Sequence, residues 1–402
     1  MKKILIFLWI ALVSPFAFMA CTEDSELIGT GNTSISTAGD GDDDKDKYDF
    51  STVYNGQTLY FKIDTTAVNE CYVTSGNRND WVTTDEETND GYYTYYSGDV
   101  EIPSQVMYDG TVYKVTAIGE YAFYETKLTS VTIPSSMKNI GEEAFSYCDD
   151  LNEITVEGGN AEFTVVDDVL YTKDMTTLVV YPGGKTDTDF TVESFVDSIA
   201  DYAFGYNTYL KNLTVESNTV ELSYKILNSC AGLTSITVRD DNPNYTIVGG
   251  VLYNKDRTEL LSYPQGKTAT DFTVPSTVRK IKCYAFYNCS NLRTVTMQDG
   301  LSIIQEYAFW LCKNLRSVVI PSTTKQIITC AFLYCNNLSS ITIYVLEPFD
   351  ISDYVFDSWD EESYDTYQIY KNATLYVPAG TKTAYQNTDC WNYFEHIVEM
   401  SE

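Results

Sequence analysis

The chain has 402 residues, and its 57 acidic and 26 basic residues give a formal net charge of −31 at pH 7. Such an acidic surface repels phosphate groups, which argues against nucleic acid as a partner. The single histidine, His396, argues against hydrolases that need histidine for proton transfer or metal ligation. We therefore expect a protein that is not an enzyme and that carries no cofactor.

Residues 1–20 have the pattern of an export signal. Lys2 and Lys3 precede an apolar run that ends at Ala20, and Cys21 follows directly. A short basic segment followed by an apolar run is typical of a secretory signal peptide. The four residues that end at Cys21, Phe-Met-Ala-Cys, resemble a lipobox, and this resemblance implies that Cys21 is lipidated. A plain secreted protein and an uncleaved anchor are the alternatives.

Residues 21–49 form a separate, acidic segment. Nine acidic and two basic residues give positions 22–49 a net charge of −7. Low hydrophobicity and repulsion between like charges predict a disordered tether here. The acidic residues beside Cys21 also resemble the signal that sends Bacteroidetes lipoproteins to the outer face of the outer membrane. That resemblance implies an outer-membrane lipoprotein exposed at the cell surface, in contact with the membrane only through its lipid.

The aspartates of this segment invite comparison with a calcium-binding loop. Asp40, Asp42 and Asp44 have suitable spacing, but Lys45 and Ser51 stand where an EF-hand requires glycine and glutamate. Zinc is disfavoured too, because the chain contains no Cys-x-x-Cys pair. We predict no metal site.

Residues 50–113 contain short alternating apolar runs, such as Leu59–Ile63, broken by Asn and Gly. This pattern predicts a small antiparallel β region. Repeat proteins need such a cap, because a bare terminal repeat exposes apolar surface and strand edges. We expect residues 50–113 to cover the first repeat.

Residues 114–372 are built from a repeated unit. Its leading position, most often Leu, falls at 128, 151, 187, 210, 233, 269, 292, 315 and 338, in steps of 23 and, twice, 36. A constant period of this size is the signature of a solenoid, a stack of similar units. Each unit buries its apolar face only against its neighbours.

The unit that begins at Leu128 shows how one repeat is expected to fold. Its period-2 alternation predicts a half-buried strand, which Pro134 ends. A glycine turn follows, and Ile140, Ala144 and Phe145 then supply an apolar set sufficient for one helical or 3₁₀ turn. We expect one short strand and one return turn in each unit.

The two longer steps contain the same insertion. Residues 163–171 and 245–253 align 82 positions apart, and both insertions lead to a Tyr-Pro pair, at Tyr181 and Tyr263. We predict a β-hairpin in each. A composite repeat of 82 residues therefore overlies the basic one.

Units of the form Leu-x-x-Ile-x-Ile-Pro-x-x-Val-x-x-Ile-Gly-x-x-Ala-Phe-x-x-Cys resemble the BspA-type leucine-rich repeats of bacterial surface proteins. The resemblance covers about residues 111–399 and implies an α+β, mostly β solenoid of short strands and tight turns or short helices. Residues 373–402 resemble the C-terminal end of such arrays and are expected to form a cap. One departure is Leu227, which replaces the phenylalanine and predicts looser packing in its unit.

The resemblance also implies a role. Proteins of this family act in adhesion and in contact with host or neighbouring cells, so the expected partner is a host or bacterial surface protein. The alternative is a glycan-binding accessory lipoprotein. An enzyme ranks third, because carboxylates such as Glu142, Asp201 and Glu306 lie at repeat positions, whereas a glycoside-hydrolase pair would interrupt the repeat.

Five of the ten cysteines fall three residues after the phenylalanine of their unit, or after Leu227 in its place. They are Cys148, Cys230, Cys289, Cys312 and Cys335. This placement predicts a column of free, buried thiols, whose parallel side chains do not suit the geometry of a disulfide. Cys71, Cys283, Cys330 and Cys390 are less regular, and a bridge among them stays open.

Two columns are candidate binding surfaces. The central outward position of the strand is Thr in eight of nine units, including Thr132, Thr155, Thr214, Thr237 and Thr296. Threonine is also the ordinary choice for an exposed strand position. The other column precedes Ala-Phe and comprises Tyr121, Tyr202, Tyr284 and Tyr307. Its rings suit protein or sugar contacts, or they shield the core.

Overall fold

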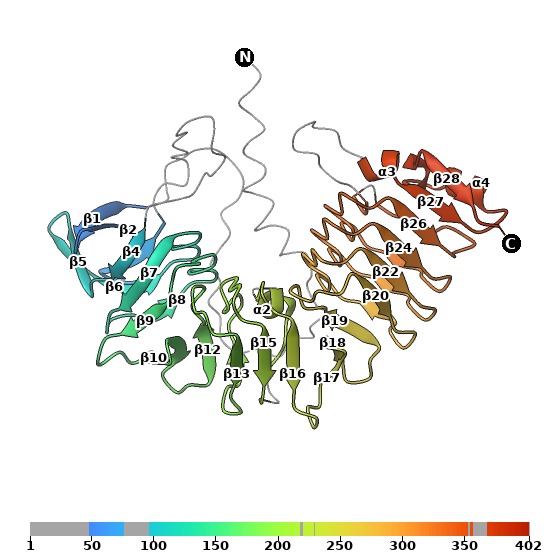
Figure 1. Ribbon diagram of the computed structural model, residues 1–402. Helices are drawn as coiled ribbons and strands as arrows, with labels where there is room; N and C mark the ends of the chain where they lie inside the picture. The colour runs from blue at the N-terminus through green and yellow to red at the C-terminus, as the bar shows by residue number, and fades with distance from the viewer. Residues whose placement is uncertain are drawn as a thin grey trace, which may run out of the picture. The chain divides into compact units, whose positions relative to one another are not determined.

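The structure is a computed structural model (Figure 1), and part of the chain is described in it. The described residues are 48–75, 96–217, 220–228, 230–352, 354–356 and 368–401. The predicted signal peptide, Cys21 and nearly all of the predicted tether lie outside them. Among the helices of these described residues, none has the length and apolar character needed to cross a membrane.

The N-terminal region is a curled β-sheet with the strand order β1-β2-β3-β6-β5. Its strands are β1 (Phe50–Tyr54), β2 (Gln57–Ile63), β3 (Glu70–Thr74), β5 (Gln105–Tyr108) and β6 (Thr111–Ile118). Neighbouring strands are antiparallel except β3 and β6, which run parallel. Phe50 of β1 stacks on Tyr108 of β5, with ring centroids 4.4 Å apart, so the two outer strands approach each other.

The strands of the repeats form parallel ladders in three blocks, which β4 of the predicted N-terminal cap and β27 and β28 of the predicted C-terminal cap extend (Figure 1). The first block is β4 (Ser97–Glu101), β7 (Lys127–Ile133) and β9 (Glu153–Val156). The second is β13 (Asp189–Val192), β15 (Asn212–Val215) and β16 (Ser235–Val238). The third is β20 (Asp271–Val274), β22 (Thr294–Met297), β24 (Ser317–Ile320), β26 (Ser340–Ile343), β27 (Thr374–Val377) and β28 (His396–Glu399). The predicted solenoid of short strands is confirmed.

A second, narrower set of parallel strands, the narrow ladder, directly precedes the return turn of the units and lies in three separate sheets. Its members are β8 (Asn139–Ile140), β14 (Ser198–Ile199), β21 (Lys280–Ile281), β23 (Ile303–Ile304) and β25 (Gln326–Ile327). Turns follow these two-residue strands, and the helical alternative is found at α2 (Tyr224–Asn228), in the unit with Leu227. The other helices of the described residues, α3 (Gln368–Asn372), α4 (Lys382–Gln386) and the 3₁₀ segment η1 (Trp391–Tyr393), lie near the C-terminus.

Both insertions are β-hairpins, as predicted. The first consists of β10 (Phe163–Val166) and β11 (Val169–Thr172), and the second of β17 (Tyr245–Val248) and β18 (Val251–Asn254). A third strand, β12 (Thr177–Val180) or β19 (Glu259–Ser262), pairs antiparallel with the hairpin and parallel with the narrow ladder. The Lys185 ammonium forms an ion pair with Asp168 at 3.7 Å. Lys267, 82 positions later, donates a hydrogen bond to the Gly249 carbonyl at 2.8 Å. Equivalent lysines thus hold both hairpin turns.

Stacked phenylalanines form the centre of the core. The ring of Phe309 lies 4.6 Å from that of Phe286 and 4.9 Å from that of Phe332, measured between centroids. All three side chains are fully buried. Leu227, which replaces the phenylalanine of its unit, is 3% exposed, so the core of that unit is also shielded from water. Burial of a large apolar side chain contributes roughly 1.5–3 kcal/mol, and here it depends on the neighbouring unit.

The cysteine column lies beside these rings, buried and reduced as predicted. The Cys148 thiol donates to the Phe123 carbonyl at 2.9 Å, and the Cys312 thiol donates to the Phe286 carbonyl at 2.9 Å. Cys335 bonds the Phe309 carbonyl in the same way, at 3.2 Å, so these three cysteines each bond the phenylalanine of the preceding unit. Burial raises the pKa of Cys148 to about 11, which makes the thiol unreactive.

The irregular cysteines form no bridge with one another. Cys71, Cys330 and Cys390 are reduced thiols in the structure. The bridge that the sequence left open among these three and Cys283 is therefore not present.

Candidate binding surface

The threonine column lies on the outer face of the parallel strands. Paired strands place Thr132 beside Thr155 and Thr214 beside Thr237, and the hydroxyls of the first pair are 2.9 Å apart. Thr155 and Thr237 are exposed, whereas Thr132, Thr214 and Thr296 are half-buried. Because the hairpin insertions divide the ladders into three blocks, the column is three short rows. A binding role for these threonines stays a prediction.

The tyrosine column occupies an unusual backbone conformation. The residue before Ala-Phe is left-handed in each unit of this kind, with φ of 56° at Tyr121, 56° at Tyr202, 57° at Tyr284 and 54° at Tyr307. A side chain in this region costs roughly 1–2 kcal/mol and persists only where the surroundings hold it. The repeated conformation places these rings at the same point of their units, which are successive for Tyr284 and Tyr307.

Rings from further positions extend the column. Tyr121 contacts Tyr124 at 5.6 Å and Tyr124 contacts Tyr147 at 5.2 Å, between centroids. Tyr147 then stacks on Tyr206 at 3.8 Å. Tyr147 also hydrogen-bonds Tyr287, which connects this group to rings 140 positions later.

A second group continues the row through the third block. Tyr284 lies between Tyr224, at 4.8 Å, and Tyr307, at 5.1 Å. Trp310 contacts Tyr287 at 5.3 Å and Tyr307 at 5.6 Å. We name the whole set the aromatic belt: Tyr121, Tyr124, Tyr147, Tyr202, Tyr206, Tyr224, Tyr284, Tyr287, Tyr307 and Trp310.

The structure corrects one expectation about this column. Tyr202 is 3% exposed and Tyr284 is 1% exposed, so these two rings are buried and are not a contact edge. Tyr284 is enclosed because a ring packs on either side of it. Shielding of the core, the alternative for the column, fits these two residues. Tyr121 and Tyr307 are half-buried and keep part of each ring open.

Several residues of the aromatic belt were not predicted from the sequence, although a pattern in the sequence marks their positions. Tyr124, Tyr287 and Trp310 directly follow the repeated phenylalanine, and Tyr147 and Tyr206 follow it by two positions. With Tyr334, which follows Phe332 by two positions, an aromatic side chain just after the phenylalanine recurs in six units.

Several carboxylates lie beside the first part of the aromatic belt. Lys225 of α2 donates to Glu142 and to Asp201, at 2.8 Å in each case, and its ammonium lies 5.6 Å from the Tyr202 ring centroid. Burial lowers the pKa of Lys225 and the two carboxylates raise it, and the net shift is upward. Burial, followed by the charge of Glu142, raises the pKa of Glu143 to about 7. The surface around Glu143, at the start of the belt, therefore becomes more negative as the pH rises through neutrality.

A cavity of about 210 Å³ lies next to this ion-paired group. Glu142, Glu143, Asp201 and Tyr202 contribute to its lining, together with apolar residues of the neighbouring units. A glycoside hydrolase would present two carboxylates to a sugar at such a place. Here the Lys225 ammonium bonds two of the three carboxylates, so they act as partners of a structural cation. Within the described ranges, no group of three or more potential ligand side chains could hold a metal ion.

Comparison with known proteins agrees with this geometry. The family described as the BspA type leucine rich repeat region matches in six copies, over residues 111–174, 185–257 and 262–372. These stretches make up more than half of the chain. No curated protein matches the chain.

Solved structures that match the chain come from several bacteria. A leucine-rich repeat protein from Eubacterium ventriosum is 23% identical, with a TM-score of 0.49, over 75% of this chain and 72% of that chain. A leucine rich cell surface protein from Faecalibacterium prausnitzii is 20% identical, with a TM-score of 0.38, over 88% and 95% of the two chains. The pneumococcal vaccine antigen PcpA is 16% identical, with a TM-score of 0.38, over 89% and 100%. On the evidence of its repeats, the chain belongs to the BspA-type leucine-rich repeat family.

Proposed function

We propose that the protein is a lipid-anchored adhesion scaffold on the outer face of the outer membrane. Cys21 carries the lipid, the acidic segment to residue 49 separates the repeats from the bilayer, and the solenoid binds a protein of a host or of a neighbouring bacterium. Membership of the repeat family supports an interaction scaffold in general. The lipid anchor and the class of partner are the proposed additions.

The aromatic belt is the reason for our choice of binding surface. Tyrosine and tryptophan are enriched among the residues that dominate protein interfaces, because they bury a large area at little entropic cost. Half-buried rings such as Tyr121 and Tyr307 are already held by their neighbours, so little conformational freedom is lost on binding.

Charge indicates the chemistry of the partner. The belt begins among Glu120, Glu142, Glu143 and Asp201, with Lys225 as the cation bonded to two of them, and the chain as a whole carries −31. Such a surface attracts a basic protein and raises its rate of association at low salt. We infer that the partner presents lysine and arginine around an apolar contact.

Replacement of two belt tyrosines is expected to weaken binding. Asparagine tolerates the left-handed backbone of Tyr121 and Tyr307, so the double variant Tyr121→Asn, Tyr307→Asn keeps the fold and loses ring area. We expect at least about a tenfold rise in Kd for the partner that the wild type binds in a panel of purified host matrix proteins. Surface plasmon resonance at two salt concentrations gives both the affinity and the association rate.

The threonine column supplies the matched control. Thr155→Lys with Thr237→Lys alters two exposed positions on the other candidate surface, and affinity should stay within about threefold of wild type. If the threonine variant loses binding while the tyrosine variant retains it, the ladder face is the binding surface and the belt assignment is wrong.

A further inference from the structure

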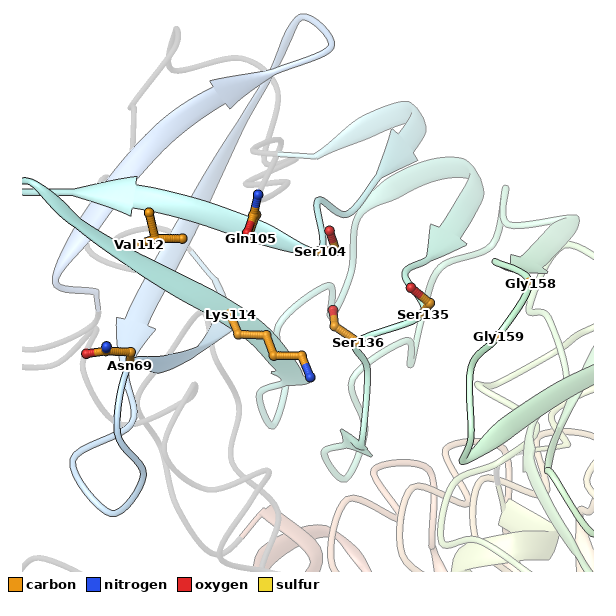
Figure 2. Close-up of a pocket in the computed structure, with 9 residues that line it drawn as sticks. All are labelled: Asn69, Ser104, Gln105, Val112, Lys114, Ser135, Ser136, Gly158 and Gly159. Carbon is orange, nitrogen blue, oxygen red and sulfur yellow. The ribbon is translucent and has the colours of Figure 1, made fainter.

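A larger hollow lies where the N-terminal sheet meets the first repeats (Figure 2). Its volume is about 560 Å³, within the range of about 300–1,000 Å³ that is usual for small-molecule sites. Gln105, Val112 and Lys114 line it from β5 and β6, and Ser135 and Gly158 line it from the segments that follow β7 and β9. The hollow contains no belt residue.

The lining is unusual for this protein because it contains no carboxylate. Side chains of Ser, Gln and Asn accompany one cation, Lys114, although acidic residues outnumber basic ones 57 to 26 in the chain. Figure 2 shows the Lys114 side chain extending from β6 toward Ser136, whereas Asn69 points away from the other labelled residues. Among the residues that the structure describes, Lys114 forms no ion pair.

Two carboxylates near this hollow are bonded to other groups. Glu70 accepts from Lys138 at 2.6 Å and from Thr116 at 2.9 Å, and its pKa is lowered first by the Lys138 hydrogen bond, then by that of Thr116, and to a smaller extent by the charge of Lys114, its partner across the strands. Glu157 accepts from the backbone N–H of Ser135 at 2.8 Å. These carboxylates already have donors of their own. Among the described residues, Lys114 acts on Glu70 through its charge without an ion pair, so its ammonium keeps its donors for an external anion.

We propose that this hollow binds an anionic saccharide, a sugar that carries a carboxylate or a sulfate. The Lys114 ammonium would bond the acidic group, since charge-assisted hydrogen bonds are the strong ones. The hydroxyl of Ser135 and the amide of Gln105 both donate and accept, as sugar hydroxyls require. Val112, 47% exposed at the rim, offers an apolar surface to the C–H face of a ring. This inference goes beyond the proposed protein binding and does not depend on it.

Calorimetric titration of the purified full chain tests the proposal with three probes: a galacturonic acid trimer, a sulfated galactose trimer and a neutral galactose trimer. We expect binding of at least one charged trimer, and binding at least about tenfold weaker, or none, for the neutral trimer. Lys114→Gln should weaken the charged trimer by about tenfold, the usual effect of removing one charge-assisted hydrogen bond. Lys173→Gln, which removes an exposed lysine directly after β11 of the first hairpin, should leave affinity unchanged.

A second variant blocks the hollow by volume. A Cβ built at Gly158 meets no atom within 4 Å, so Gly158→Trp fills open space without forcing the backbone. We expect it to abolish saccharide binding while the thermal midpoint stays within about two degrees of wild type.

Tyr121→Asn with Tyr307→Asn should leave saccharide affinity unchanged, which separates this site from the belt.

Four outcomes overturn the proposal. They are no binding of either charged trimer, equal binding of the neutral trimer, equal effects of Lys114→Gln and Lys173→Gln, and binding of inorganic sulfate alone as tight as that of the charged trimers. The last result would identify a simple anion site.

Discussion

Phe309→Ala is expected to lower the free energy of unfolding by about 3–5 kcal/mol. Phe309 is fully buried, and its ring lies between the rings of Phe286 and Phe332 at 4.6 and 4.9 Å. Removal of the ring leaves a cavity that touches both neighbouring units. Because each unit is stable only through its neighbours, the loss weakens two interfaces together. Urea unfolding followed by tyrosine and tryptophan fluorescence measures the effect.

The chain itself supplies the control for this variant. Leu227 stands at the equivalent position of its unit and is 3% exposed, so a leucine at this position can shield the core of a unit from water. Phe309→Leu should therefore cost about 1–2 kcal/mol, well below the alanine variant. Equal costs for leucine and alanine would show that ring stacking, and not filled volume, supplies the stability.

Gly141→Ala is expected to lower the free energy of unfolding by about 3 kcal/mol, the upper part of the usual range for overpacking. A Cβ at this position would lie 2.4 Å from the Glu120 backbone nitrogen and 2.7 Å from the Gly119 carbonyl carbon. Backbone atoms of the preceding unit cannot move aside as the end of a side chain can. The close approach of two return turns therefore requires glycine here.

The corresponding position of a later unit tests this explanation. Gln305 follows Ile304 as Gly141 follows Ile140, and it carries a full side chain there. Gln305→Ala should change the unfolding free energy by less than about 1 kcal/mol. The thermal unfolding of both variants, measured by circular dichroism, makes the comparison. A Gly141→Ala protein as stable as wild type would mean that the two units separate at little cost.

Periodicity in the sequence predicts the fold well, because one unit repeats with few changes. The alternation around Leu128 and the stop at Pro134 predict the main strands, and the matching insertions predict both hairpins. The narrow ladder could not be predicted, since a two-residue strand such as Asn139–Ile140 has no period of its own. Its pairing comes from the stacking of units.

The candidate surfaces are less accessible from the sequence, because they depend on neighbours that the repeat does not determine. The sequence places Tyr284 in a column, but its burial depends on Tyr224, which lies in the unit that departs from the repeat. The ion pair between Glu142 and Lys225 joins residues 83 positions apart. The hollow beside Lys114 likewise forms between a sheet and loops that share no motif.

Protease treatment of intact cells most directly tests whether the protein is a surface-anchored scaffold. A brief exposure to protease, with the remaining protein quantified by mass spectrometry, should remove most of the wild-type chain and leave a periplasmic control protein intact. Cys21→Ser should abolish the association of the protein with the outer membrane. If the wild-type chain survives the protease as fully as the periplasmic control, the protein is not displayed at the surface and the proposed adhesion function is wrong.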